Sequence, residues 1–157
     1  MNKKVSWIAI LPQLIPSIPW QGIHWDFAVE KYKVMVQITT NGLLIKRYQD
    51  FLLNSKTIRQ VNFSLQSFKD NFPEKPMGPY LGDILDFSQK AALVAPEMFI
   101  NLRLWNLESE ASDNEEIFGF IESKLDLQIN RRVDVGGIKS KRIINRLYLH
   151  FDSRFEW

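Results

Sequence analysis

The final stretch of the chain shows the clearest alternation of apolar and polar residues. Its apolar residues fall at every second position, with Ser153 as an interruption: Leu147, Leu149, Phe151, Phe155 and Trp157. The positions between them are polar or charged: Arg146, Tyr148, His150, Asp152, Arg154 and Glu156. Because successive side chains of a strand point to opposite faces, this spacing predicts a strand near 145–156 with one buried face and one polar face.

Three further stretches have strand character. Residues 5–11 form a short apolar run rich in β-branched and aromatic side chains, which predicts a buried strand. Apolar and polar residues also alternate over 29–40 and over 98–107. Asn41-Gly42 follows the first of these and supplies the two positive-φ residues of a type I′ turn, so we expect a hairpin that pairs Ile38 with Ile45.

Apolar residues at helical spacing predict three helices, near 56–70, 83–94 and 113–127. The first stretch is ambiguous, because the segment from Val61 to Gln66 alternates as a strand does; we prefer the helix. Asp83 is the expected N-cap of the second helix. Ser112, with Glu115 three residues later, forms a capping box at the start of the third.

The order of these elements indicates the fold class. Strands and helices are interspersed without a regular strand–helix alternation, which predicts an α+β fold with a mostly antiparallel sheet. At 157 residues, of which 45% are hydrophobic, the chain has the size and composition of one globular domain, and we expect a single domain over 1–157. Segments rich in proline or glycine at 72–82 and 130–142 are the expected loops.

The net charge of +2 conceals an uneven distribution. Residues 1–78 carry ten Lys/Arg against five Asp/Glu, residues 79–130 carry three against ten, and residues 131–157 carry seven against three. An acidic middle between two basic arms predicts either attraction across the folded surface or faces that meet different partners.

Composition and motifs exclude several classes of function. The chain has no cysteine, which rules out disulfides, thiolate catalysis and cysteine-ligated metals and fits a reducing compartment, so we expect a cytoplasmic protein. No apolar run approaches the roughly 18 to 20 residues of a membrane span, and we expect no membrane association. No Gly-x-Ser-x-Gly turn, Walker loop or dinucleotide motif occurs, so we assign no catalytic residue and no cofactor.

Both histidines stand two residues before an aspartate. His24 and Asp26 form one pair, and His150 and Asp152 form the other. In an extended backbone residues at i and i+2 point to the same side, so each pair can offer a nitrogen and a carboxylate to one metal ion. If the two pairs were neighbours, they would form the site of a metal-dependent hydrolase, which is our second alternative function.

The stretch 131–146 is basic and hinged by paired glycines. Its cations, with the aromatic ring that follows, are the candidate nucleic-acid-binding residues: Arg131, Arg132, Lys139, Lys141, Arg142, Arg146 and Tyr148. Lysines and arginines contact phosphates, and a tyrosine ring can stack on a base. Nucleic-acid binding is therefore the first alternative function. A simpler interpretation is a basic loop that pairs electrostatically with the acidic residues between Glu115 and Asp126.

An aromatic, proline-rich stretch near residue 20 is the candidate interface with a protein partner. Trp20, His24 and Trp25 lie beside three prolines and a glycine, and exposed tryptophans are typical anchors of protein interfaces. With no catalytic or cofactor pattern present, we expect a small, soluble, non-catalytic protein. It would dock on a macromolecule, most of all a protein, as an inhibitor, an immunity protein or a complex subunit.

Overall fold

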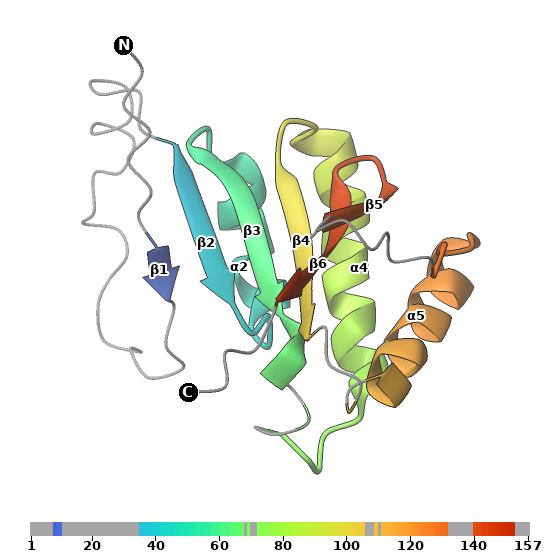
Figure 1. The fold of residues 1–157 in the computed structure, drawn as a ribbon. Coiled ribbons are helices and arrows are strands. Elements are labelled where there is room, and N and C mark those ends of the chain that lie inside the picture. The colour runs from blue at the N-terminus through green and yellow to red at the C-terminus, as the bar shows by residue number, and fades with distance from the viewer. Residues whose placement is uncertain are drawn as a thin grey trace.

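The computed structural model describes residues 8–10, 35–67, 69, 72–105, 109, 111–131 and 140–152 (Figure 1). The strands are β1 (Ile8–Ile10), β2 (Val36–Thr40), β3 (Ile58–Ser64), β4 (Phe99–Trp105), β5 (Ser140–Ile144) and β6 (Leu147–Asp152). The helices are α2 (Ile45–Asn54), α4 (Met77–Val94) and α5 (Ala111–Leu125), and a short 3₁₀ turn, η2 (Leu65–Ser67), follows β3.

The six strands form one mixed sheet in the order β1-β2-β3-β4-β6-β5. Every neighbouring pair is parallel except β5 and β6, which form an antiparallel hairpin. The predicted α+β class is confirmed, but the expected mostly antiparallel sheet is wrong. Between β2 and β6 a helix returns the chain before each new parallel strand, and a parallel pair requires such a crossover.

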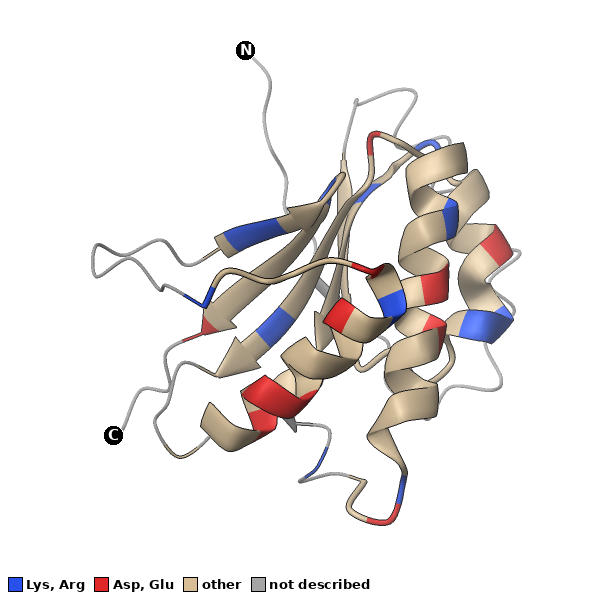
Figure 2. Ribbon diagram, turned by 90° about the vertical axis from the view of Figure 1, so that its right-hand side faces the viewer, with Lys and Arg blue, Asp and Glu red and all other residues tan. Residues whose placement is uncertain are grey.

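The three helices lie side by side on one face of the sheet (Figures 1 and 2). The core fills the space between the two layers, and its largest fully buried side chains come from both: Phe63, Leu102 and Leu149 from the strands, and Leu81, Phe87 and Ile121 from the helices. The opposite face of the sheet carries polar side chains. Within the described residues no helix is both long and apolar enough to cross a membrane.

The terminal strand has the two faces that its alternation predicts. Leu147 and Leu149 of β6 are buried in the core, and Tyr148 and His150 point to the polar face, where they are half-buried. The strand lies inside the sheet, between β4 and β5. Its predicted end, residues 153–156, lies outside the described residues.

The expected hairpin at Asn41-Gly42 is wrong, and so is the type I′ turn, because only Gly42 of the pair has a positive φ. Gly42 has a φ of +76°, and the Asn41 side chain accepts a hydrogen bond from the Leu43 N–H (3.2 Å). The chain then enters α2, so Ile38 pairs with Val61 of β3 instead of Ile45. The Ile45 N–H donates a hydrogen bond to the Gly42 carbonyl (3.0 Å), and Ile45 is buried as the first residue of α2.

Residues 56–70 contain a strand where we preferred a helix. Val61 and Phe63 are fully buried on the helix side of the sheet, and Asn62 between them points to the polar face. Asn62 there accepts a hydrogen bond from the Asn101 amide (2.8 Å) and donates one to the Thr39 hydroxyl (3.2 Å). Burial between two neighbouring strands overrides the helical spacing, because β-structure depends mainly on such cross-strand packing.

Two predicted loops contain regular structure. The helix expected at 83–94 begins at Met77, within the predicted loop 72–82. Pro79 fits in its first turn, where a missing N–H leaves no hydrogen bond unmade. Asp83 is therefore not a cap, and it pairs instead with Lys46 of α2 at 2.6 Å. The second loop, 130–142, leads into β5, which no alternation in the sequence marks. The helix expected at 113–127 is confirmed as α5.

Gly42→Ala should destabilise the protein by roughly 1–3 kcal/mol, because φ is positive and the new Cβ would lie 2.7 Å from Cδ1 of the buried Phe63. Gly119→Ala is the matched control, since a Cβ there meets nothing within 4 Å inside α5. It should stabilise by about 0.5–1 kcal/mol. Urea unfolding of the two variants measures both, and equal stabilities would contradict the turn geometry.

Candidate functional site

The polar face of the sheet is organised in rows that cross the strands. Strand register places Thr39, Asn62, Asn101, Tyr148 and Arg142 in one row across five strands. A second row, nearer the carboxyl ends of the parallel strands, contains Ser64, Arg103, His150 and Ser140. Side chains in register on adjacent strands are close enough to interact, so this face can present a continuous polar surface.

Asp152 is the centre of a charged cluster at the second row. One of its carboxylate oxygens, Oδ2, accepts hydrogen bonds from Arg103 Nε (2.9 Å) and Gln66 Nε2 (3.2 Å). The other, Oδ1, lies 3.4 Å from Nε2 of His150, whose Nδ1 lies 2.6 Å from the Ser140 hydroxyl. We call Gln66, Arg103, Ser140, His150 and Asp152 the Asp152 cluster.

The Asp152 cluster contains two of the four ligands of the predicted metal site, His150 and Asp152. His150 and Asp152 point to the same side, as their spacing predicts, and lie close enough to interact. The other oxygen of the Asp152 carboxylate, Oδ2, is already paired with the guanidinium of Arg103 at 2.9 Å. No group of three or more potential metal ligands occurs within the part of the chain that the structure describes. His24 and Asp26 lie outside it, so the shared four-ligand site stays a prediction.

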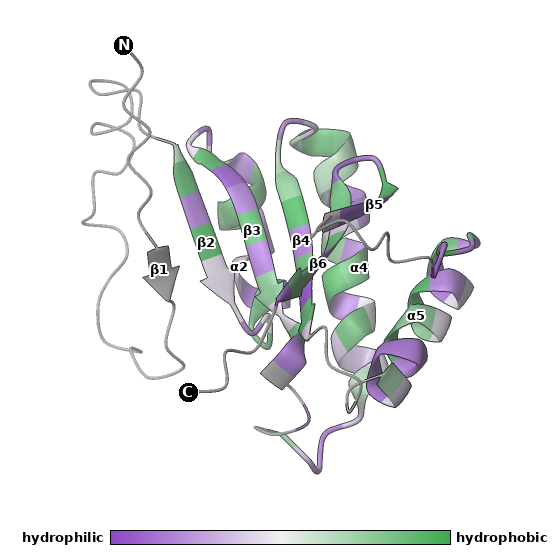
Figure 3. Cartoon of the chain, in the orientation of Figure 1, coloured by the Kyte–Doolittle hydropathy of each residue, from purple (hydrophilic) through white to green (hydrophobic). Residues whose placement is uncertain are grey.

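A group of partly or fully exposed apolar and aromatic side chains occurs on both layers at the end of the sheet where β4 begins, with Phe99 and Tyr148 on the polar face and Leu93 and Val94 at the end of α4. It comprises residues from the end of α4, the start of β4 and the β5–β6 hairpin, and we call it the hairpin patch: Leu93, Val94, Phe99, Ile144, Arg146 and Tyr148. Leu93 is 83% exposed and Val94 is 64% exposed. Figure 3 shows hydrophobic positions at the upper end of α4 and at the end of β5.

Arg146 contacts the aromatic part of the hairpin patch and the start of β4. Its guanidinium lies over the Phe99 ring, 4.6 Å from the centroid, and also bonds Glu97 at 3.0 Å. Its backbone carbonyl accepts a hydrogen bond from the Ile100 N–H (3.0 Å), which fixes the hairpin turn against β4. The Phe99 and Tyr148 rings are 5.9 Å apart. The aromatic part of the patch is therefore built on two paired strands.

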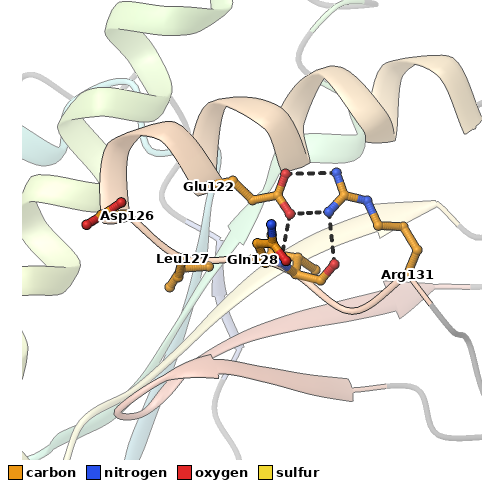
Figure 4. A pocket seen from close by; sticks show the side chains of 6 residues that line it. Glu122, Asp126, Leu127, Gln128 and Arg131 are labelled. Carbon is orange, nitrogen blue, oxygen red and sulfur yellow. Dashed lines mark hydrogen bonds and ion pairs between the residues drawn. The ribbon is translucent and has the colours of Figure 1, made fainter.

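Arg131, the first of the predicted nucleic-acid-binding residues, is engaged inside the molecule. It bonds Glu122 through two nitrogens and the backbone carbonyl of Ile129 at 2.9 Å (Figure 4). It also bonds Glu115 at 3.1 Å. Together with an Ile129 N–H bond, Arg131 lowers the pKa of Glu122 to about 2. The hollow of about 600 Å³ beside α5 is lined by Glu122, Ile129 and Arg131 of this group, together with Asp126, Leu127 and Gln128. The simpler interpretation, a basic residue that pairs with acidic residues of the neighbouring helix, therefore holds for Arg131.

The remaining predicted cations differ in what they contact. Lys141 donates a hydrogen bond to the backbone carbonyl of Asn130, and Arg146 is engaged in the hairpin patch. Arg142 is exposed, lies opposite Tyr148 and makes no ion pair within the described residues. Arg132 and Lys139 lie outside those residues, as do Trp20, His24 and Trp25 of the predicted protein interface.

Several residues of both surfaces did not stand out in the sequence. The alternation from Met98 to Leu104 is the signal that places Phe99 and Arg103 on the polar face. No comparable signal exists for Ser140, which reaches His150 only through hairpin register. No family model, curated protein or solved structure matches the chain, so its function has to be inferred from this surface chemistry.

Acid should weaken the contact between Glu122 and Arg131. Because folding lowers the pKa of Glu122 from 4.5 to about 2, the contact stabilises fully above pH 4.5 and is lost as the pH falls toward 2. We expect the melting temperature of Glu122→Gln to fall less than that of the wild type over this range. The control is Glu74→Gln, at an exposed carboxylate, which should follow the wild type. Parallel curves for wild type and Glu122→Gln would contradict the assignment.

Proposed function

We propose that the chain works by docking on a protein partner, as an inhibitor, an immunity protein or a complex subunit. The observation that carries this proposal is the hairpin patch. Neighbouring exposed apolar side chains mark interaction sites on protein surfaces, and Leu93 and Val94, adjacent at the end of α4, are exposed more than any other described large hydrophobic residues. Aromatic residues and arginine, here Phe99, Tyr148 and Arg146, are the types enriched in binding hot spots.

The patch is also rigid enough for a docking surface. Phe99 and Tyr148 belong to adjacent paired strands, and the Arg146 carbonyl ties the hairpin turn to β4. The Arg146 guanidinium is already positioned by Glu97 and the Phe99 ring. A surface whose side chains are ordered before binding loses less conformational entropy when the partner arrives, which favours affinity.

The charge distribution supports docking through this end of the molecule. On the helices, acidic side chains are largely paired with nearby cations, as in Lys46–Asp83, Lys124–Asp86 and Arg131–Glu122 (Figure 2). Such pairs leave the helical layer with little charge to attract a partner. The proposal places the protein in the cytoplasm, since a chain without cysteine needs no oxidising compartment.

Nucleic-acid binding is a second candidate function, favoured by one observation. Arg142 and Tyr148 face each other across β5 and β6, with Asn101 next in the same row. A cation beside an aromatic ring on the surface of a sheet is suited to a phosphate and a stacked base of a single strand. It ranks second because Arg131, Lys141 and Arg146 already bond groups of the chain itself.

Leu93→Asp should abolish docking. A tagged full-length chain can be used to capture its partner from native lysate, with the bound protein identified by mass spectrometry. A charge at the most exposed position of the hairpin patch must be desolvated on binding, so the captured protein should be lost. Leu44→Asp, at the exposed N-cap residue of α2 toward the opposite end of the sheet, is the matched control and should retain it. Equal capture by both variants would overturn the role of the patch.

Arg142→Ala should weaken any complex with single-stranded RNA. Loss of one phosphate contact should lower the slope of log affinity against log salt by about 0.7 for a single strand. Arg47→Ala, on the helical layer, should leave the slope unchanged. Gel-shift titrations at several salt concentrations measure both. If wild type forms no complex at low salt, the second candidate function is wrong.

A further inference from the structure

Ser140, His150 and Asp152 form a continuous chain of polar contacts on the polar face of the sheet. The Ser140 hydroxyl oxygen lies 2.6 Å from His150 Nδ1, and His150 Nε2 lies 3.4 Å from Asp152 Oδ1. A hydroxyl next to an imidazole that is oriented by a carboxylate is the arrangement that activates a serine for nucleophilic attack. Recognition of this chemistry rests on geometry and is independent of sequence order.

One neutral tautomer of His150 fits both contacts. An ionised Asp152 can only accept, so its proximity to Nε2 favours the ring protonated at that nitrogen. In this tautomer Nδ1 accepts and the Ser140 O–H donates to it. The lone pair of Nδ1 then points at the serine. A proton taken from Ser140 would leave an imidazolium beside the Asp152 carboxylate.

Two further residues fix the carboxylate. Arg103 Nε and Gln66 Nε2 both donate to Asp152 Oδ2, at 2.9 and 3.2 Å, which leaves Oδ1 for the histidine. The Asp152 side chain is only 16% exposed. Arg103, His150 and Ser140 stand in register on β4, β6 and β5. The group is thus carried on paired strands and supported by a second layer of hydrogen bonds, as a preorganised site requires.

The serine is more accessible to a substrate than the two residues that would activate it. Ser140 is exposed at the start of the edge strand β5, whereas His150 and Asp152 behind it are half-buried. We infer that Ser140 is an activated nucleophile that accepts acyl groups from carboxylic esters, with His150 as its general base and Asp152 as the positioning residue. This activity goes beyond docking and does not depend on it.

The reaction balances with the groups present. The Ser140 oxygen attacks the ester carbonyl carbon and its proton moves to His150 Nδ1. The ester C–O bond then breaks, and the leaving alcohol takes that proton from Nδ1. Water adds to the acyl-serine by the same steps and releases the acid. Ester and water become acid and alcohol, and the side chains return to their starting state.

A fluorophosphonate reagent tests the inference directly on the full-length chain. Diisopropyl fluorophosphate phosphorylates an activated serine as the P–F bond breaks, and intact-mass analysis shows one added group. We expect labelling that peptide mapping places on Ser140. Ser140→Ala should remove it, and His150→Gln should slow it by roughly 100-fold or more, as for loss of a general base. Ser112→Ala, at an exposed serine of α5, should label as the wild type does.

The same experiment can overturn the inference. An unlabelled wild type, or a Ser140→Ala variant that labels at the wild-type rate, would show that the serine merely fastens β5 to β6. A structural hydrogen bond of that kind changes stability but confers no reactivity. Circular dichroism of each variant confirms that it is folded before its rate is compared.

A thiol substitution gives a second measurement that does not depend on removing the group. The chain has no natural cysteine, so Ser140→Cys and the control Ser112→Cys each introduce a single thiol. A thiol beside a histidine that can take its proton forms thiolate below its ordinary pKa of about 8.5. Iodoacetamide at pH 6.5 should modify Ser140→Cys at least about tenfold faster than Ser112→Cys. Equal rates would overturn the assignment of His150 as base.

Discussion

The parallel pairing of β4 with β6 is the contact on which the rest of the surface depends. It aligns Asn101 with Tyr148 and Arg103 with His150 on the polar face, and it aligns Leu102 with the fully buried Leu149 at positions that point into the core. Because the chain forms β5 first and then turns back into β6, the last strand enters between β4 and the hairpin edge. Burial of the apolar face of β6 therefore fixes the position of every polar side chain opposite it.

The acidic and basic segments of the sequence form ion pairs mainly with each other within the fold. The acidic middle becomes α4 and α5, and cations from other segments reach it: Lys46 contacts Asp83, Lys69 contacts Asp113 and Glu116, and Arg131 contacts Glu115 and Glu122. Exposed pairs of this kind contribute little stability each. Their main consequence is to distinguish the two faces. The helical layer has paired charges, whereas the sheet keeps Arg103, His150 and Asp152 in one cluster and presents Arg142 at its edge.

Local patterns predicted some elements and failed where a contact between distant segments decides the structure. The alternation of the final strand and the helical spacing of α5 were sufficient, because each element buries one face in the way its own period requires. Residues 58–64 carry both periods, and only their position between β2 and β4 selects the strand. Asn41-Gly42 predicted a turn but neither its type nor the helix after it. Ser140 could not be connected with His150, since the register shift within β5 is invisible in the sequence.

The hairpin patch and the Asp152 cluster adjoin along β6, and this limits which substitutions change one surface without changing the other. Tyr148 belongs to the hairpin patch and His150 to the Asp152 cluster, two residues apart on the same face and so about 7 Å from each other. Side chains at that distance can be energetically coupled, and a change at Tyr148 would disturb both surfaces. Leu93 at the end of α4 and Ser140 at the start of β5 are better positions, because the patch meets β5 at its other end, near Ile144. Substitutions at Leu93 and at Ser140 therefore test docking and acyl transfer separately, because the two positions lie toward opposite ends of the sheet.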